Sequence, residues 1–359
     1  MSEPEMSFQA APDPSSPAGE PPAAKPRPFG VIPGLIWGFR MLDDGTAVAL
    51  PVDQPVDQPV GHDHRGWLWL HLDLADARAA RWLAKVDLPE AAVASMLSRD
   101  EHQQLHTAGS VVYGVLADLL RDINNVGDDL ATLHFVMTDR LMLTGRRHSL
   151  AAVQATRDAI EAGAARLPHC AALFELIVEH LADGIDDVDD DLADKLDEIE
   201  DHLARRSIGP ARRSLSDVRR TSVRLHRHLW GLRAVLSRVE RRGMEDLDPR
   251  LQLRAGRLVQ RLDELDHCIV ETRERGRRLQ EEVSTTIAED TNRHLHVLSV
   301  LTALLLPPAL VAGVFGMNTK NLPLTDEDGG SAWALILVFG SSLAAYLVLR
   351  LTGVLKRGD

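Results

Sequence analysis

The chain has 359 residues, enough for roughly two or three structural units, and 40 basic against 53 acidic side chains give it a formal net charge of −13. A field of that sign repels nucleic acid and attracts cations, so we expect no nucleic-acid partner and consider a cation first. Cys170 and Cys268 lie far apart, and neither has a second cysteine nearby. This excludes a disulfide framework and a paired-cysteine zinc site.

Residues 1–28 are rich in Pro, Ala and Ser and lack the charged-then-apolar pattern of a secretory signal peptide. Such a composition cannot bury enough apolar surface to fold. We interpret this segment as a disordered tail.

Residues 29–170 alternate short runs rich in β-branched and aromatic residues with helical stretches, which predicts an α/β domain with a mixed sheet. The tandem PVDQPVDQPV at 51–60 is predicted to be a loop insertion, because its prolines cannot occupy a central strand. The strand-like runs are GLIWGFRM, TAVAL, GWLWLHLDL, VVYGVLADL, LATLHFVM and RLMLTG, and the helical ones are PEAAVASMLS and SLAAVQATRDAIEAG.

From 171 to 247 the apolar residues recur every three or four positions, which predicts two helices joined at the turn-like SIGP of 207–210. Residues 183–201 hold eleven acids and one Lys, whereas 205–242 hold twelve Arg and two acids. We expect an antiparallel hairpin whose opposite charges attract. A second hypothesis is that the acidic face senses divalent cations, which prefer carboxylate oxygens. Its candidates are Asp186, Asp187, Asp189, Asp190 and Asp191.

Asp248 and Pro249 predict a helix start, since Asp accepts a hydrogen bond at an N-cap and the missing N–H of Pro costs nothing there. An apolar stripe continues without proline as far as Pro307. Residues 248–296 are therefore predicted to form a very long stalk helix that continues into a membrane span, roughly 100 Å in all.

Two charge-free runs predict transmembrane helices at 297–316 and 332–351, joined by an external loop at 317–331. Basic residues flank the pair of spans at Arg293, Lys356 and Arg357, the last two in a short tail at 352–359. The positive-inside rule then predicts a two-pass protein of the cell inner membrane with both termini in the cytoplasm.

Two spans in one chain cannot enclose a water-filled path, so transport requires a ring of chains. One stripe of the first span combines small, hydroxyl and Leu side chains, a pattern that suits a narrow conduit but also suits a helix-packing seam. The stripe consists of Asn292, Leu295, Ser299, Thr302, Leu306, Ala309 and Gly313.

The stretch LPPALVAGVFGMN at 306–318, followed by a short loop and a final span, resembles the CorA-type divalent metal transporters, whose signature is Gly-Met-Asn at the outer end of the first span. The likeness extends through the β-rich domain, the charged hairpin and the stalk. It implies a funnel-shaped homopentamer in which the first span lines the pore and the second lies outside it. It also implies an ion-selective mouth formed by Gly316, Met317 and Asn318. Asn292 would form a polar ring near the cytoplasmic end, and Leu295 and Leu298 would form hydrophobic gates.

An amide at the mouth has a physical rationale, because a small divalent cation holds its water tightly and neutral oxygens can receive the hydrated ion. Five copies of Lys320 at the mouth would repel cations. The acidic residues Asp326, Glu327 and Asp328 leave the same loop net negative and offer cation attraction as an alternative to plain solvation.

The runs GLIWGFR, GTAVALP and GWLWLHLDLADARA are similar to the zinc-transporting ZntB branch of this family, which implies zinc as the transported ion. His294 and His296 are candidates for proton coupling where the stalk enters the membrane. Magnesium or cobalt transport stays open, because no His or Cys follows His296 and the mouth lacks the nitrogen and sulfur ligands that favour zinc.

The sequence contains no His-Glu-x-x-His motif, phosphate-binding loop or nucleophile elbow, so we expect neither an enzyme nor a resident cofactor. The expected partners are further copies of the chain, membrane lipid and the divalent ion. The rival hypothesis is a membrane-anchored metal sensor that conducts nothing.

Overall fold

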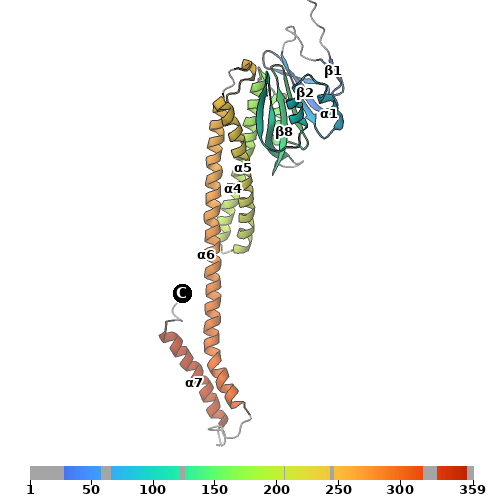
Figure 1. Cartoon of the computed structure of the whole chain (residues 1–359). Helices are drawn as coiled ribbons and strands as arrows, with labels where there is room; N and C mark the ends of the chain where they lie inside the picture. The colour runs from blue at the N-terminus through green and yellow to red at the C-terminus, as the bar shows by residue number, and fades with distance from the viewer. Residues whose placement is uncertain are drawn as a thin grey trace, which may run out of the picture. The chain divides into compact units, whose positions relative to one another are not determined.

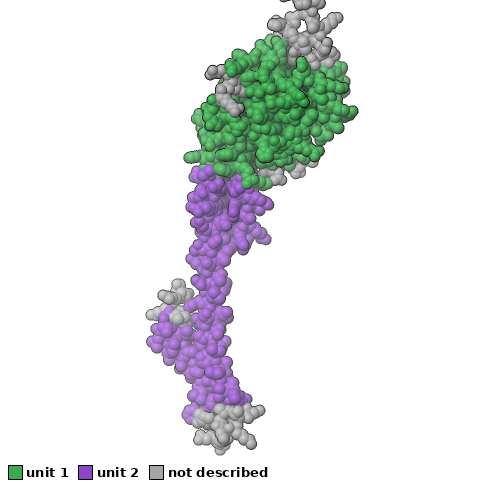
Figure 2. All heavy atoms as spheres, viewed as in Figure 1, with its two compact units in different colours: residues 1–189, 224–269 green, residues 190–223, 270–359 purple. Residues whose placement is uncertain are grey.

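The computed structural model describes residues 28–57, 66–121, 126–205, 207–242, 246–317 and 330–353. The chain divides into two compact units, coloured separately in Figure 2. The first contains Met1–Asp189 and Arg224–Ile269, and the second contains Asp190–Val223 and Val270–Asp359.

A seven-stranded sheet forms the centre of the first unit, with strand order β3-β2-β5-β9-β8-β7-β6 (Figure 1). Only β5 and β9 run parallel and the other pairs are antiparallel, so the predicted mixed sheet is confirmed. The strands are β2 (Leu35–Met41), β3 (Ala47–Leu50), β5 (Trp67–Asp73), β6 (Gln104–Ala108), β7 (Val111–Arg121), β8 (Val126–Met137) and β9 (Leu141–Arg146).

Alternation along β5 builds both faces of the core. Leu68, Leu70 and Leu72 pack in one cluster with residues of α1 (Ala77–Leu83) and α2 (Glu90–Leu97). On the opposite face, Trp69 Nε1 donates to the hydroxyl of Thr144 at 2.8 Å, deep in the core. The side chains of β5 are therefore buried on both faces, as expected for a strand in the interior of the sheet.

Two details of the sheet domain differ from the sequence-based prediction. Strand β6 was not predicted, because QLHTA has no apolar alternation of its own. The expected loop at 51–60 contains a two-residue strand, β4 (Val56–Asp57), which pairs with β1 (Pro28–Gly30). Residues 58–60 lie outside the part of the chain that the structure describes.

The helical part consists of α4 (Cys170–Ala204), α5 (Ile208–Arg242), α6 (Ala255–Phe315) and α7 (Gly330–Leu351) (Figure 1). The hairpin helices are antiparallel, since the first part of α4 shares a unit with the last part of α5 and the second part of α4 with the first part of α5. Ile208 to Pro210 belong to α5 rather than to a turn, because a proline in the first helical turn loses no hydrogen bond.

The stalk helix begins seven residues later than the predicted start at Asp248. Asp248 caps a 3₁₀ turn, η1 (Pro249–Leu251), and accepts a hydrogen bond from the backbone N–H of Arg250 at 2.8 Å. The following helix, α6, begins at Ala255, and a carboxylate oxygen of Glu175 accepts from the backbone N–H of Arg254 at 2.6 Å. A side chain of α4 therefore supplies the cap that the local sequence does not.

The structure also gives the acidic residues of α4 partners on α6, which the sequence analysis did not consider. Among the ion pairs described within each unit, α4 carboxylates reach arginines of α6: Glu179 to Arg257 at 3.0 Å, Asp186 to Arg261 at 2.8 Å and Glu200 to Arg275 at 2.8 Å. Charge totals over a whole helix do not specify which face turns toward which neighbour. Helix α6 has mixed charge, so its basic residues escaped the sequence analysis.

Asp118 of β7 caps the N-terminus of α3 (Ala151–Glu161), whose own N-cap residue, Leu150, makes no side-chain hydrogen bond. Both carboxylate oxygens accept from the backbone N–H of Ala152, at 3.2 and 3.1 Å. Burial raises the pKa of Asp118 from 3.8 to about 7, although the backbone donors favour the ionised form. The folded state therefore binds a proton here that the unfolded chain releases.

We predict that Asp118→Asn weakens the pH dependence of stability. Below the unfolded pKa near 3.8 the carboxyl is protonated in both states; as the pH rises to about 7 the folded protein loses this contribution, which amounts to roughly 4 kcal/mol at most. The amide keeps an acceptor for α3 and does not titrate. The unfolding temperature, measured in detergent from pH 4 to 8, should fall with rising pH less steeply in the variant than in the native chain. The exposed Asp87→Asn is the control, and equal slopes for Asp118→Asn and the native chain would show that the prediction is wrong.

Candidate functional site

Among the residues that the structure describes, two helices of the second unit are long and apolar enough to cross a membrane: the C-terminal part of α6 and α7 from Ala332 to Leu351. Their apolar 18-residue windows contain at most two charged residues and are not buried within the chain. A soluble core helix of this composition would be buried instead. The candidate site lies on these two helices.

Partial burial marks the face that each span turns toward the other in Figure 1. On α7 the partly buried residues recur at helical spacing, and a matching stripe follows one face of α6. The two stripes define the contact between α6 and α7. The α6 stripe comprises His296, Val300, Ala303, Leu304, Pro307, Pro308, Val311 and Phe315, and the α7 stripe comprises Ala334, Val338, Ser341, Ser342, Ala345 and Leu349.

The residues predicted to line a conduit lie on the other side of α6. An α-helix turns by about 100° per residue, which places their stripe roughly opposite the α7-facing one. All of them are exposed in the chain, including Leu295 at 55% and Leu306 at 66%. Leu298, a predicted gate, is 61% exposed and lies at the edge of the same stripe. One chain therefore leaves this face of α6 uncovered.

The polar groups of α6 are distributed between these faces. The hydroxyl of Thr302 donates to the backbone carbonyl of Leu298 at 2.8 Å, so its oxygen lone pairs remain available as acceptors on the uncovered face. Pro307 and Pro308 lie within the continuous helix and remove the N–H partners of the carbonyls of Ala303 and Leu304. Those two residues belong to the α7-facing stripe. The two residues whose carbonyls lose their helical donors thus lie on the face toward α7.

Helix α6 ends at Phe315, just before the Gly-Met-Asn signature. The backbone N–H of Gly316 still donates to the carbonyl of Ala312 at 2.9 Å, and a Cβ on Gly316 would come within 3.1 Å of the same oxygen. Met317 is 56% exposed. The remaining predicted mouth and loop residues, Asn318, Lys320, Asp326, Glu327 and Asp328, lie outside the described residues, so their roles stay predictions.

The acidic residues proposed as a metal sensor do not converge within one chain. Asp186 pairs with Arg261, Asp189 is buried at 5% exposure, and Asp187, Asp190 and Asp191 are exposed. Over the described ranges, no group of three or more His, Cys, Asp or Glu side chains is placed to hold a metal ion. The sensing hypothesis therefore stays a prediction.

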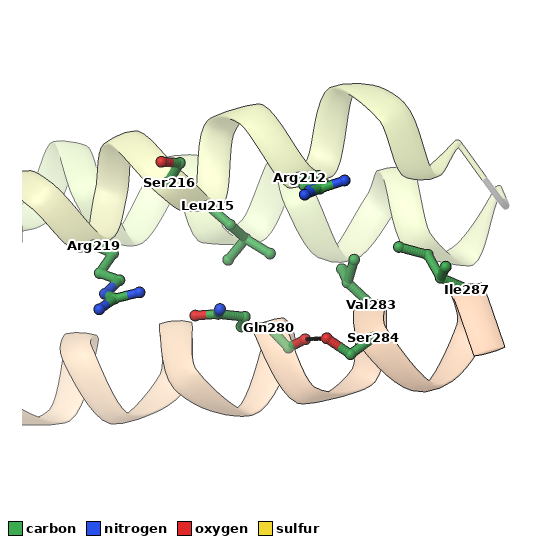
Figure 3. Close-up of a pocket in the computed structure, with 8 residues that line it drawn as sticks. All are labelled: Arg212, Leu215, Ser216, Arg219, Gln280, Val283, Ser284 and Ile287. Atoms are coloured by element: carbon green, nitrogen blue, oxygen red, sulfur yellow. Dashed lines mark hydrogen bonds between the residues drawn. The ribbon is translucent and has the colours of Figure 1, made fainter.

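A groove that the sequence analysis did not identify lies between α5 and α6 (Figure 3). It encloses about 450 Å³. Arg212, Ser216 and Arg219 of α5 line one wall, and Gln280 and Ser284 of α6 line the other. The spacing of three and four residues on α5 was the available signal, but the arginines were interpreted only as part of a basic helix.

Comparisons with known proteins identify the family of the chain. A family model described as CorA-like Mg²⁺ transporter protein matches residues 64–352. Zinc transport protein ZntB of Yersinia enterocolitica is 28% identical over 286 residues, covering 75% of this chain and 83% of that protein, and ZntB of Pectobacterium carotovorum is 29% identical over 267 residues, covering 73% and 80%.

Two full-length structures have similar folds. The CmaX protein has a TM-score of 0.71 at 25% identity, with 88% of this chain and 97% of that chain covered. The CorA magnesium transporter of Methanocaldococcus jannaschii also has a TM-score of 0.71, at 16% identity, with 88% and 98% covered. The chain belongs to the CorA-like transporter family. It is therefore a membrane transporter of divalent cations and not an enzyme.

The prediction that the uncovered stripe of α6 lines a conduit specifies which positions a water-soluble reagent should reach. In a Cys268→Ser background, Ser299→Cys or Thr302→Cys should react with a cationic methanethiosulfonate roughly tenfold faster than Val300→Cys or Val311→Cys, because a thiol must be hydrated to ionise. The latter two are matched controls on the α7-facing stripe. Rates would be measured on protein reconstituted in liposomes. Equal rates at all four positions would contradict a hydrated face. Faster reaction at Val300→Cys would show that the hydrated face is the α7-facing stripe and not the uncovered one.

Proposed function

We propose that this protein carries zinc across the inner membrane through a homopentameric pore lined by α6, with α7 outside it. The observation that carries the proposal is the uncovered stripe of α6, which combines small, hydroxyl and Leu side chains and lies opposite the α7-facing stripe. A ring of chains gives this stripe a common axis to face. The number five comes from the family resemblance.

Two kinds of ring along the stripe have different tasks. Rings of Asn292, Ser299 and Thr302 present oxygens to the water shell of a passing ion. Rings of Leu295, Leu298 and Leu306 form apolar constrictions that close when water leaves them. Ala309 and Gly313 leave room for a hydrated ion. The Leu rings then close the pore by losing their water, and no ion has to be bound for closure.

The mouth is proposed to receive the ion with its water in place. Asn318 supplies amide oxygens, and Gly316 and Met317 set the end of the helix behind it. Asp326, Glu327 and Asp328 outweigh Lys320 on the connecting loop and raise the local cation concentration. Both termini lie in the cytoplasm, where the basic flanks of the spans favour them.

Zinc is proposed because the relatives described above are named zinc transport proteins. Magnesium is the alternative, since the proposed mouth contains neither His nor Cys and its amide and carbonyl oxygens do not favour zinc. Coupling to protons would use His294, which is exposed, or His296, which lies on the α7-facing stripe. A non-conducting metal sensor is the rival from another class of function.

Metal flux into liposomes tests the proposal. Zinc uptake by the purified protein should be accelerated by a proton gradient and should fall by at least roughly tenfold in Asn318→Ala, because removing the amide leaves the ion's water without its acceptors. The matched control is Asn321→Ala, a second amide on the same loop. Light scattering would verify that both variants keep their assembly.

Each alternative outcome has a definite meaning. Flux of magnesium alone would assign the magnesium specificity. Zinc flux that ignores the proton gradient would remove the coupling. Absence of both fluxes from correctly assembled protein would contradict transport and favour the sensor. An equal loss of zinc flux in Asn318→Ala and Asn321→Ala would show that Asn318 has no specific role.

A further inference from the structure

The outer face of α4 in the second unit carries a row of unpaired acids. Asp190, Asp191, Asp194 and Glu198 are exposed, and none has an ion pair among the described residues. Asp201 continues the row, and its one ion pair within the part of the chain that the structure describes is with Arg205 of the same helix, at 3.5 Å with both side chains 75% exposed. Like charges three and four residues apart repel each other on a helix. The row is therefore destabilising unless something basic covers it.

The outer face of α5 in the same unit is basic. Arg213 is exposed and has no ion pair among the described residues, and Arg220 pairs only with Asp217 on its own helix, at 3.3 Å with both side chains more than 70% exposed. Arg213 and Arg220 are seven residues apart, as are Asp194 and Asp201, so each pair forms a row along its helix.

The height of the two rows along the bundle can be compared through α6. A Cβ added at Gly276 would lie 3.7 Å from Leu196 of α4 and 3.9 Å from Val218 of α5, so these three residues share one level. Because α4 and α5 run antiparallel, a step up one helix matches a step down the other. Two residues from this level toward the N-terminus of α4 and two toward the C-terminus of α5 put Asp194 level with Arg220. Five residues in the opposite direction on each helix put Asp201 level with Arg213.

We propose that the acidic row of α4 on one copy of the chain docks against the arginine row of α5 on the next copy. In a ring whose members all point the same way along its axis, residues at one level of one copy meet residues at the same level of the next. Asp194 then pairs with the next copy's Arg220, and Asp201 with its Arg213. The inference rests on the ring assembly proposed above.

A second copy is favoured over another basic partner because the chain itself carries both complementary faces, in register and with equal spacing. A head-to-tail contact of this kind uses every acidic row and every basic row in a closed ring. It also brings the next copy beside the groove between α5 and α6, since Arg212 and Arg219 line that groove and occupy positions adjacent to Arg213 and Arg220. Counting from the same level puts Glu198, which lies between the two proposed pairs, level with Ser216, and so about one helical turn from each of the groove arginines Arg212 and Arg219.

Cross-linking between two differently tagged chains tests the register. Asp194→Cys in one chain and Arg220→Cys in the other, both with Cys268→Ser, are co-expressed and treated with a short bis-methanethiosulfonate. The mismatched control combines Asp194→Cys with Arg213→Cys, about 10 Å out of register, and should give roughly tenfold less product linking the two tags. A chain carrying both Asp194→Cys and Arg220→Cys reports any bond within one copy.

Charge reversal tests the energetic contribution. Asp194→Lys/Asp201→Lys and Arg213→Glu/Arg220→Glu should each shift the detergent-solubilised oligomer toward monomer, more strongly at low salt, whereas the four changes in one chain should restore it. Asp87→Lys/Glu101→Lys, at exposed sites of the sheet domain, makes the same change in net charge as Asp194→Lys/Asp201→Lys and is the control for that variant.

The outcomes separate this interface from the transport function. Matched cross-links with rescue by the fourfold variant would support the interface. An oligomer that still transports zinc but gives equal matched and mismatched products, or only the bond within one chain, would overturn the interface and leave the function standing. A monomer that yields no product between chains would overturn the interface and the ring on which it rests.

Discussion

The register between α4 and α6 is the constraint on which the other features depend. A capping hydrogen bond joins Glu175 to Arg254, 79 positions further along the chain. Two ion pairs, Asp183 with Arg261 and Asp197 with Arg275, each join residues 78 positions apart. A constant separation means that the two helices run parallel without slipping. Exposed pairs of this kind contribute little singly, about 0.2–1 kcal/mol each, but as a series they select one register for a seam whose buried side chains are mostly aliphatic. That register determines which acids remain for other partners.

A second constraint acts on the apolar helices, where the backbone must satisfy its own hydrogen bonds. Pro307 and Pro308 break this rule locally, and the residues whose carbonyls they free belong to the α7-facing stripe. The uncovered stripe opposite thereby keeps a continuous hydrogen-bonded backbone and offers side-chain oxygens such as that of Thr302. The two faces of α6 therefore differ: one packs against α7, and the other is the face proposed to line the pore.

The sequence was sufficient for features that depend on local periodicity. The alternating runs became strands of a mixed sheet, and the long apolar runs became the two apolar helices. Features that depend on distant side chains were missed: Glu175 capping Arg254, Asp118 capping α3 and arginines of α6 taking the acids of α4. Strand β6 forms because β7 offers it an edge to pair with, which no property of QLHTA reveals. At the candidate site, periodicity identified one stripe on α6 but not which face α7 would cover.

The choice of metal is harder to derive because the proposed mouth lacks the ligands that distinguish zinc. Nitrogen and sulfur donors bind Zn²⁺ in preference to Mg²⁺, whereas oxygen donors around a hydrated ion see mainly its charge and its water shell. A neutral mouth therefore admits several divalent ions. Selection must then occur where dehydration begins or through the force that drives transport. His294 and His296, at the start of the apolar segment, are the last imidazoles in the sequence, so proton coupling offers a chemical route by which zinc could be accumulated without a zinc-specific mouth.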